Sequence, residues 1–179
     1  MSRKPLLVDL SALDFERPVA AIEEIRKFNR QRFEMEQLTA VVYDSRDENL
    51  CVGYKDVTEN EFWVRGHMPG MPLMPGVVML EAMAQLCSFF VQRHDMLGCE
   101  IVGFGGLEEV YFRGPVVPGD RLVLICKLIK IRPGRMLVCE FQGVVGDNVV
   151  VDGKLKGIPL PTEEVQKRTA AAQNSTSPA

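Results

Sequence analysis

The segment from Val77 to Val91 predicts a helix that is apolar or small on nearly every side. A helix at the surface of a globular protein keeps a polar face toward water, so this helix has to be covered by other parts of the fold. Its single charged residue is Glu81. Because the burial of an unpaired carboxylate is costly, Glu81 needs a hydrogen-bonding partner or a chemical role.

A narrow polar stripe runs along this helix, since Glu81, Gln85, Ser88 and Gln92 recur at helical spacing. The stripe faces either water at an exposed edge or a reaction groove. It carries one charge where surface stripes usually carry several, which favours the groove. Gln85 follows Glu81 by one turn, a spacing at which its amide can hydrogen-bond and orient the carboxylate.

The helix follows a stiff loop, Gly66 to Gly76, in which prolines and glycines alternate. Proline fixes φ and glycine relieves crowding, so this segment is a shaped loop and not a flexible linker. The loop carries His67. Gly76 lies at the helix start, where backbone N–H groups lack partners and the macrodipole presents partial positive charge. Pro75 and Val77 flank Gly76 and are interpreted as supporting residues.

These residues form a candidate acid-base site. A thioester carbonyl held at the Gly76 N–H would be stabilised as it becomes enolate-like, and loss of such a donor costs about 3 kcal/mol of transition-state stabilisation. A neutral His67 imidazole can remove the neighbouring α-proton, while a protonated Glu81 can give a proton to a departing β-hydroxyl. The sum of these steps is elimination of water.

A metal site is not expected. His67 and His94 are far apart, and no cysteine or carboxylate stands near them at the spacing of zinc ligands. His94 is assigned to a favourable interaction with the helix end and has no catalytic role. The five cysteines contain no CxxC pair, which is typical of buried, reduced thiols and not of disulfides.

The bulk properties exclude several classes of function. The length of 179 residues predicts one domain with less ordered terminal segments. A net charge of −3 and a pI near 5.5 argue against a nucleic-acid or anionic-membrane surface. No apolar run has the length of a membrane span, and the N-terminus lacks the apolar core and small-residue cleavage site of a signal peptide. We therefore expect a cytoplasmic protein.

The order of elements predicts an α+β fold in which an antiparallel sheet wraps the central helix. An N-terminal extension, residues 1–38, contains an amphipathic helix from Val19 to Phe33. The domain proper covers residues 39–160, and residues 161–179 are expected to form a disordered tail. Strands are predicted at Thr39–Tyr43, Leu50–Val57, Glu100–Phe104, Leu107–Phe112, Arg121–Arg132, Met136–Val145 and Val149–Ile158.

Two motifs resemble a known enzyme family. The string His67–Val77, continued by Leu80–Gln85, is similar to the (3R)-hydroxyacyl-acyl-carrier-protein dehydratases of bacterial fatty-acid synthesis. A second block, Phe112–Leu122, resembles the strand and turn that follow the central helix in that family. The resemblance extends from about Thr39 to Ile158.

The resemblance implies a hot-dog fold and a dehydratase that needs no metal or redox cofactor. Two subunits would pair edge to edge into a continuous sheet, and three dimers often associate. The residues matching His67 and Glu81 would meet across the dimer interface, with the Gly76 N–H as carbonyl donor. The substrate would be an acyl chain carried on the phosphopantetheine of acyl carrier protein. Glutamate at position 81 resembles the dehydratase branch more than the dehydratase-isomerase branch.

Some positions depart from the family pattern. The family carries a Pro-His-Arg loop before its first strand, whereas this chain has Asn29–Glu36 there. Met68 stands where phenylalanine is usual. These differences bear on acyl-chain length and carrier docking, and they leave the acid-base pair in place.

Two alternatives stay open at this point. One is a hot-dog acyl thioesterase, in which a carboxylate activates water beside the polarised thioester. The other is a non-catalytic subunit that binds acyl carrier protein. Arg113, Arg132 and Arg135 are candidate contacts for an acidic carrier or its phosphate, although solvated surface charge explains them equally well.

Overall fold

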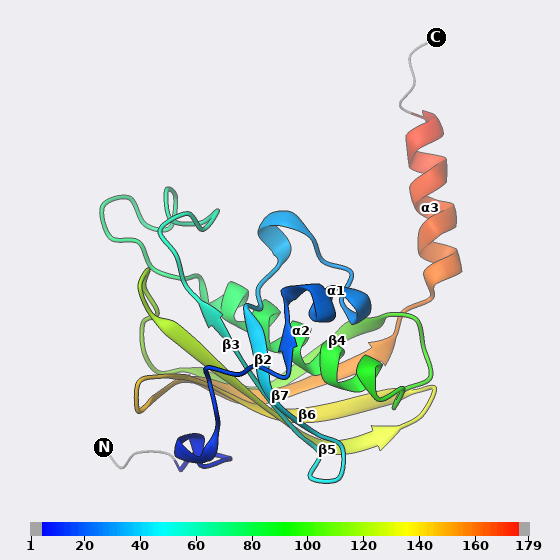
Figure 1. The fold of residues 1–179 in the computed structure, drawn as a ribbon. Helices are drawn as coiled ribbons and strands as arrows, with labels where there is room; N and C mark the ends of the chain where they lie inside the picture. Colours follow the sequence, from blue (N-terminus) through cyan, green and yellow to red (C-terminus); the bar gives the residue numbers. More distant parts are fainter. Residues whose placement is uncertain (1–4, 176–179) are drawn as a thin grey trace.

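The computed structural model describes residues 5–175 and consists of one seven-stranded antiparallel sheet with a long helix lying on it (Figure 1). The strands lie side by side in the order β1-β2-β3-β5-β6-β7-β4, so β4 is an edge strand. Their bounds are β1 Ala20–Ala21, β2 Ala40–Ser45, β3 Leu50–Asp56, β4 Val102–Phe112, β5 Arg121–Arg132, β6 Met136–Val145 and β7 Asn148–Pro159. The predicted α+β class is confirmed.

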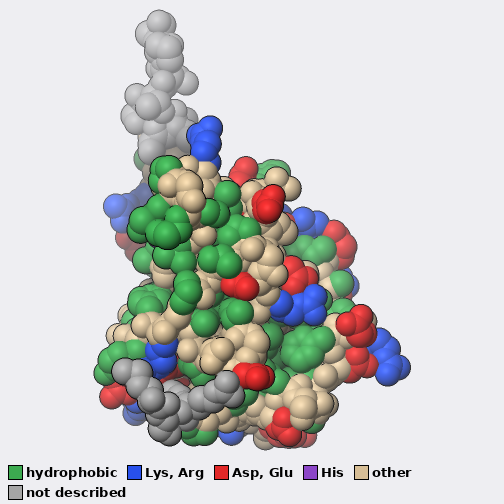
Figure 2. All heavy atoms as spheres, turned by 90° about the vertical axis from the view of Figure 1, so that its left-hand side faces the viewer, with side chains coloured by type: hydrophobic (Ala, Val, Ile, Leu, Met, Phe, Trp, Pro, Cys, Tyr) green, Lys and Arg blue, Asp and Glu red, His purple; other side chains and the backbone are tan. Residues whose placement is uncertain are grey.

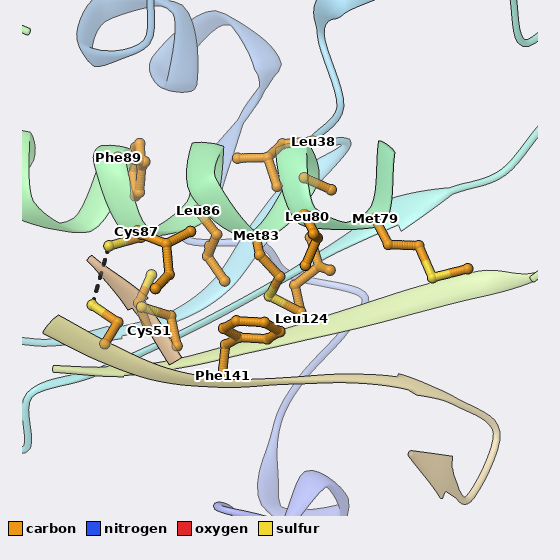
Figure 3. Packing of buried hydrophobic residues seen from close by; sticks show 14 of the residues in the cluster. Leu38, Cys51, Met79, Leu80, Met83, Leu86, Cys87, Phe89, Leu124 and Phe141 are labelled. Atoms are coloured by element: carbon orange, nitrogen blue, oxygen red, sulfur yellow. Dashed lines mark hydrogen bonds between the residues drawn. The ribbon is translucent and has the colours of Figure 1, made fainter. Parts of the chain in front are cut away.

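Helix α2, Gly76–Arg93, is covered on two sides, which explains its apolar sequence. Leu86 and Met83 point from the helix toward the sheet, and Phe141 points back at them from β6 (Figure 3). On the opposite side of α2, Phe89 meets the ring of Phe28 edge-on at 5.6 Å between centroids. The helix therefore lies between the sheet and the N-terminal segment.

The N-terminal helix is shorter than the predicted Val19–Phe33. Helix α1 spans Ile22–Phe28, a 3₁₀ turn (η2) spans Phe33–Met35, and β1 pairs with β2 just before α1. The chain becomes extended at Asn29, whose side-chain amide donates 2.9 Å to the carbonyl of Gln85 on α2. This tertiary hydrogen bond takes the place of another helical turn.

The face of the sheet that points away from α2 is covered by the first described residues of the chain, from Pro5 to Phe15. Gln142 on β6 is 1% exposed; its amide oxygen accepts from the Leu7 N–H at 2.9 Å and its amide nitrogen donates to the Pro5 carbonyl at 3.0 Å. These bonds hold a short apolar segment, which contains the 3₁₀ turn η1 (Leu10–Ala12), against the sheet. The side chains packed there are Leu6, Leu7, Val8, Leu10, Leu13 and Phe15.

One strand replaces two predicted ones after α2. Glu100–Phe104 and Leu107–Phe112 were expected as separate strands, but β4 runs through both and pairs with β7 along its length. The register shifts at Phe104/Gly106, where Gly106 has φ 156°. A β-bulge at this glycine lets the strand continue where the sequence suggests an interruption.

A third helix, α3, spans Thr162–Ser175, where a disordered tail was expected for residues 161–179. The helical conformation corrects that expectation for this part of the tail. Pro161 precedes the helix, and Glu163 and Glu164 in its first turn complement the helix dipole. Side chains from Glu163 to Ala171 are exposed, so the mobility of this segment stays a prediction. Residues 176–179 lie outside the described part of the chain.

No helix within residues 5–175 is long and apolar enough to cross a membrane.

Candidate active site

The loop that precedes α2, residues 57–75, projects from one end of the molecule and is fastened at several points (Figure 1). Lys55 on β3 and Glu61 in the loop form an ion pair of 2.9 Å whose side chains are 8% and 10% exposed. The Met74 N–H donates to the Val116 carbonyl at 2.8 Å, which ties the other end of the loop to the chain before β5. The loop is thus held in one shape.

His67 is half-buried in this loop and has a defined orientation. Its backbone N–H donates to the Trp63 carbonyl at 2.7 Å, and its own carbonyl accepts from Leu73 at 2.8 Å. Its ring Nδ1 lies 2.7 Å from the Leu73 carbonyl oxygen. Because a carbonyl oxygen only accepts, Nδ1 carries the hydrogen, and in the neutral imidazole Nε2 keeps a free lone pair.

Glu81 is the sixth residue of α2 and is half-buried. Its Oε1 accepts hydrogen bonds from Gln85 Nε2 at 2.8 Å and from Gln31 Nε2 at 3.3 Å. An amide NH₂ group only donates, so both bonds fix Oε1 as an acceptor. If the carboxyl group is protonated, the proton therefore resides on Oε2.

Gln85 is 2% exposed and connects Glu81 to the N-terminal segment. Besides its bond to Glu81, its Nε2 donates 2.7 Å to the Met35 carbonyl, and its Oε1 accepts from the Gln37 N–H at 2.8 Å. The structure thus contains the Gln85–Glu81 hydrogen bond expected from their spacing. Gln31 was not identified from the sequence, because no local pattern indicates that this segment folds over α2.

The Gln85→Leu variant is expected to be less stable, with a free energy of unfolding lower by about 1–3 kcal/mol. The change leaves the Gln37 N–H and the Met35 carbonyl without their partner. Urea denaturation measures the loss. Gln92→Leu is the matched control, since Gln92 makes an exposed hydrogen bond to the Glu100 carbonyl and should cost less than about 0.5 kcal/mol. Equal losses in the two variants would contradict the anchoring role of Gln85.

Gly76 is the first residue of α2, and the helix has no side-chain cap at Pro75. The Val78 N–H donates to the Pro75 carbonyl at 2.9 Å, so the Gly76 and Val77 N–H groups are the ones that can meet a ligand oxygen. A Cβ atom at position 76 would stand 2.7 Å from the ring of Phe112, so the site accepts only glycine without movement of that ring. Val77 is 72% exposed beside it.

The predicted site residues lie in two groups within one chain. His67 and Gly76 belong to the loop and the helix start that ends it, whereas Glu81 is about 7.5 Å further along the helix axis. Within residues 5–175, no hydrogen bond or ion pair joins His67 to Glu81. A complete acid-base site is thus not formed by direct contact of the two side chains.

The three candidate arginines are placed differently. Arg113 forms an ion pair with the buried Asp152 and lies over the ring of Tyr111, 5.2 Å from its centroid. Arg132 and Arg135 belong to the β5–β6 hairpin, where the Gly134 N–H donates to the Leu97 carbonyl just after α2. Within one chain this hairpin is at the opposite end of α2 from Gly76.

A basic groove that was not identified from the sequence lies beside α1. It has a volume of about 640 Å³, and its polar lining includes Gln92 and Glu100. Arg30 is exposed and has no ion pair within residues 5–175, whereas Arg26 and Lys27 are paired with nearby glutamates. The cations of the groove are Arg26, Lys27, Arg30 and Arg32.

Comparisons with known proteins agree with this architecture. A family model described as a FabA-like domain matches residues 29–154. A 3-hydroxyacyl-[acyl-carrier-protein] dehydratase FabZ of Mannheimia succiniciproducens is 37% identical over 115 residues, which cover 64% of this chain and 72% of that protein. The FabZ of Desulfotalea psychrophila is 41% identical over 106 residues, covering 58% and 70%.

Solved structures share the fold at low identity. The dehydratase heterocomplex ApeI:P from Xenorhabdus doucetiae has a TM-score of 0.66 at 18% identity, covering 79% of this chain and 95% of that one. Cj0977, a sigma28-regulated virulence protein from Campylobacter jejuni, has a TM-score of 0.60 at 13% identity, covering 80% and 94%. The hot-dog fold implied by the resemblance is confirmed, and the chain belongs to the FabA-like family.

Proposed function

We propose that this protein is a dehydratase that converts a (3R)-3-hydroxyacyl thioester of acyl carrier protein into the trans-2-enoyl thioester and water. The two FabZ relatives are named 3-hydroxyacyl-[acyl-carrier-protein] dehydratases, which supports this reaction class. The observation that carries the assignment of residues is the hydrogen bonding of the two candidates. His67 is held with Nε2 as an acceptor, and Glu81 is held with Oε2 free to carry a proton.

In the proposed reaction, the thioester carbonyl oxygen accepts a hydrogen bond from the Gly76 N–H. His67 Nε2 removes a proton from the α-carbon, and the electron pair moves toward the carbonyl as the enolate forms. The pair then returns to make the α–β double bond, while the Glu81 proton passes to the β-hydroxyl, which leaves as water. A proton moves back from the imidazolium to the carboxylate, directly or through solvent, before the next turnover. No metal or redox cofactor takes part.

The two halves of the site are proposed to meet between two subunits. Within residues 5–175, strand β4 pairs on one side only, with β7, and the backbone groups of its other edge could pair with a second copy. Hydrophobic side chains also gather on the face that carries the loop (Figure 2). Burial of such a patch favours association. The exposed large apolar side chains of β4 and the loop are Phe62, Met68, Met71, Phe104, Leu107, Tyr111 and Phe112.

In this dimer His67 of one subunit would face Glu81 of the other, and three dimers would associate as the resemblance implies. The acyl chain would arrive on the phosphopantetheine of acyl carrier protein. We place the reaction in the cytoplasm, where five free thiols remain reduced.

One assay tests the function directly. Hydroxyacyl carriers of several chain lengths are offered to the protein, and both the enoyl product and free carrier thiol are measured. Formation of enoyl product without free thiol supports the dehydratase. Release of thiol would instead identify a thioesterase, and carrier binding without either product would identify a non-catalytic subunit.

Charge reversal separates the candidate carrier contacts. If the basic groove docks the acidic carrier, Arg30→Glu should raise the KM for the acyl carrier several-fold, and the effect should shrink at high salt. The kcat should be unchanged. Arg135→Glu is the matched control in the β5–β6 turn. A larger effect at Arg135 than at Arg30 would favour docking at the hairpin and contradict docking at the groove.

A further inference from the structure

Three cysteine side chains meet in the core away from the candidate active site. They are Cys87 on α2, Cys126 on β5 and Cys139 on β6, and their Sγ atoms all lie within 4.8 Å of one another. The sulfurs of Cys87 and Cys139 are 3.1 Å apart (Figure 3, dashed line). Each residue is at most 2% exposed.

Tertiary structure alone creates this cluster. Leu128 pairs directly with Cys139 across β5 and β6, and Cys126 precedes Leu128 by two residues on the same face of β5. Cys126 and Cys139 are therefore diagonal neighbours beneath the helix. Cys87 lies on α2, and its Sγ is within 4.8 Å of the sulfurs of both strand cysteines. No spacing in the sequence indicates this meeting, which explains why a ligand site was not expected.

The geometry fits a three-coordinate thiolate site. A central atom about 2.3 Å from each sulfur requires sulfur–sulfur distances of about 4 Å, so small side-chain shifts would complete the site. All three ligand atoms of the cluster are sulfur. Sulfur ligands favour soft, thiophilic elements over the hard cations that prefer oxygen.

The net charge of the occupied site limits which element can bind there. Three thiolates carry three negative charges, and a net charge in an apolar core is strongly disfavoured. A monovalent or divalent cation would leave the site negative, whereas a trivalent thiophilic centre makes it neutral. Arsenite, As(OH)₃, is uncharged at neutral pH and can therefore enter an apolar core without shedding the hydration shell of a cation.

A fourth buried cysteine, Cys51, lies beside the cluster. Cys51 on β3 stands opposite Cys126, but burial raises the pKa of its thiol well above the usual value. Cys51 is thus a buried neighbour that stays protonated.

We infer that Cys87, Cys126 and Cys139 form a binding site for trivalent arsenic of the arsenite class. Three S–H groups react with As(OH)₃ to form three As–S bonds, and the three protons leave with the three hydroxides as water. No atom changes its oxidation state, so the reaction needs no oxidant or reductant. The bound atom would link α2 to β5 and β6.

The full-length reduced protein tests the site without any substitution. After incubation with arsenite, native mass spectrometry should show a gain of one arsenic atom less three protons. X-ray absorption at the arsenic edge should show three sulfur neighbours and no oxygen. The melting temperature should rise with arsenite concentration, because the ligand binds only the folded arrangement. Two sulfurs plus oxygen, or no binding, would overturn the proposal.

Single alanine variants identify the ligands. Cys87→Ala, Cys126→Ala and Cys139→Ala should each abolish the three-sulfur signal, with circular dichroism to verify folding. Cys51→Ala is the control for a buried cysteine and Cys99→Ala the control for a half-buried one, and both should bind as the parent does. Loss of binding in either control contradicts the assignment. Displacement of arsenite by equimolar Zn²⁺ or Cu⁺ would contradict the charge argument.

Discussion

The Glu81→Gln variant is expected to dehydrate the hydroxyacyl carrier about 100- to 10,000-fold more slowly than the parent, because general acid catalysis contributes on that scale. Glutamine has nearly the same shape as glutamate, and its amide oxygen can still accept the hydrogen bonds from Gln85 and Gln31. It cannot supply the acidic proton that the departing hydroxyl needs. The kcat should fall while the KM stays close to that of the parent.

Two controls keep this prediction specific. Ser88→Ala, on the same polar stripe of α2, should retain near-parent activity. Gel filtration should show the same assembly for parent and Glu81→Gln. A Glu81→Gln variant with the parent's assembly and near-full activity would show that Glu81 is not the acid.

Much of the fold was predictable because its strongest patterns are local. An apolar helix with a single charge can be stable only when it is covered, and α2 lies between the sheet and the N-terminal segment. The predicted strands Arg121–Arg132 and Met136–Val145 likewise match β5 and β6, which are joined by a short turn that contains Gly134 at φ 71°. Such features depend on neighbours in sequence, and sequence reasoning finds them.

Features set by distant contacts were missed. Helix α1 stops at Asn29 because that side chain bonds to Gln85, far away in the sequence. The bulge at Gly106 joins two predicted strands into one. The segment around Leu7 packs on the outer face of the sheet, where the Leu7 N–H donates to the side chain of Gln142. In each case a tertiary contact outweighs the local preference.

The candidate site likewise has some features that follow from local sequence and others that depend on tertiary contacts. The loop shape around His67 and the turn from Glu81 to Gln85 follow from local spacing. The contribution of Gln31 depends on how the N-terminal segment crosses α2, which no local pattern reveals. Whether His67 and Glu81 meet depends on a second subunit, and this stays a prediction.

Mixed dimers are expected to show whether the sites are shared. A dimer of one His67→Asn chain and one Glu81→Gln chain should have about half the parent activity, because two-fold symmetry leaves one site with both native residues. Each variant alone should be nearly inactive. Asparagine at position 67 can still donate to the Leu73 carbonyl, so the loop contact is kept. Two different affinity tags isolate the mixed dimer for the assay.

The reciprocal pairing supplies the decisive control. A chain carrying both substitutions is paired with a parent chain. If each site draws His67 from one subunit and Glu81 from the other, both sites of this dimer lack one residue and activity should be lost. If each chain instead holds a complete site, this dimer keeps about half the activity and the first mixed dimer is inactive. The two arrangements therefore predict opposite results from the same pair of preparations, and the second result would remove the proposal of shared sites.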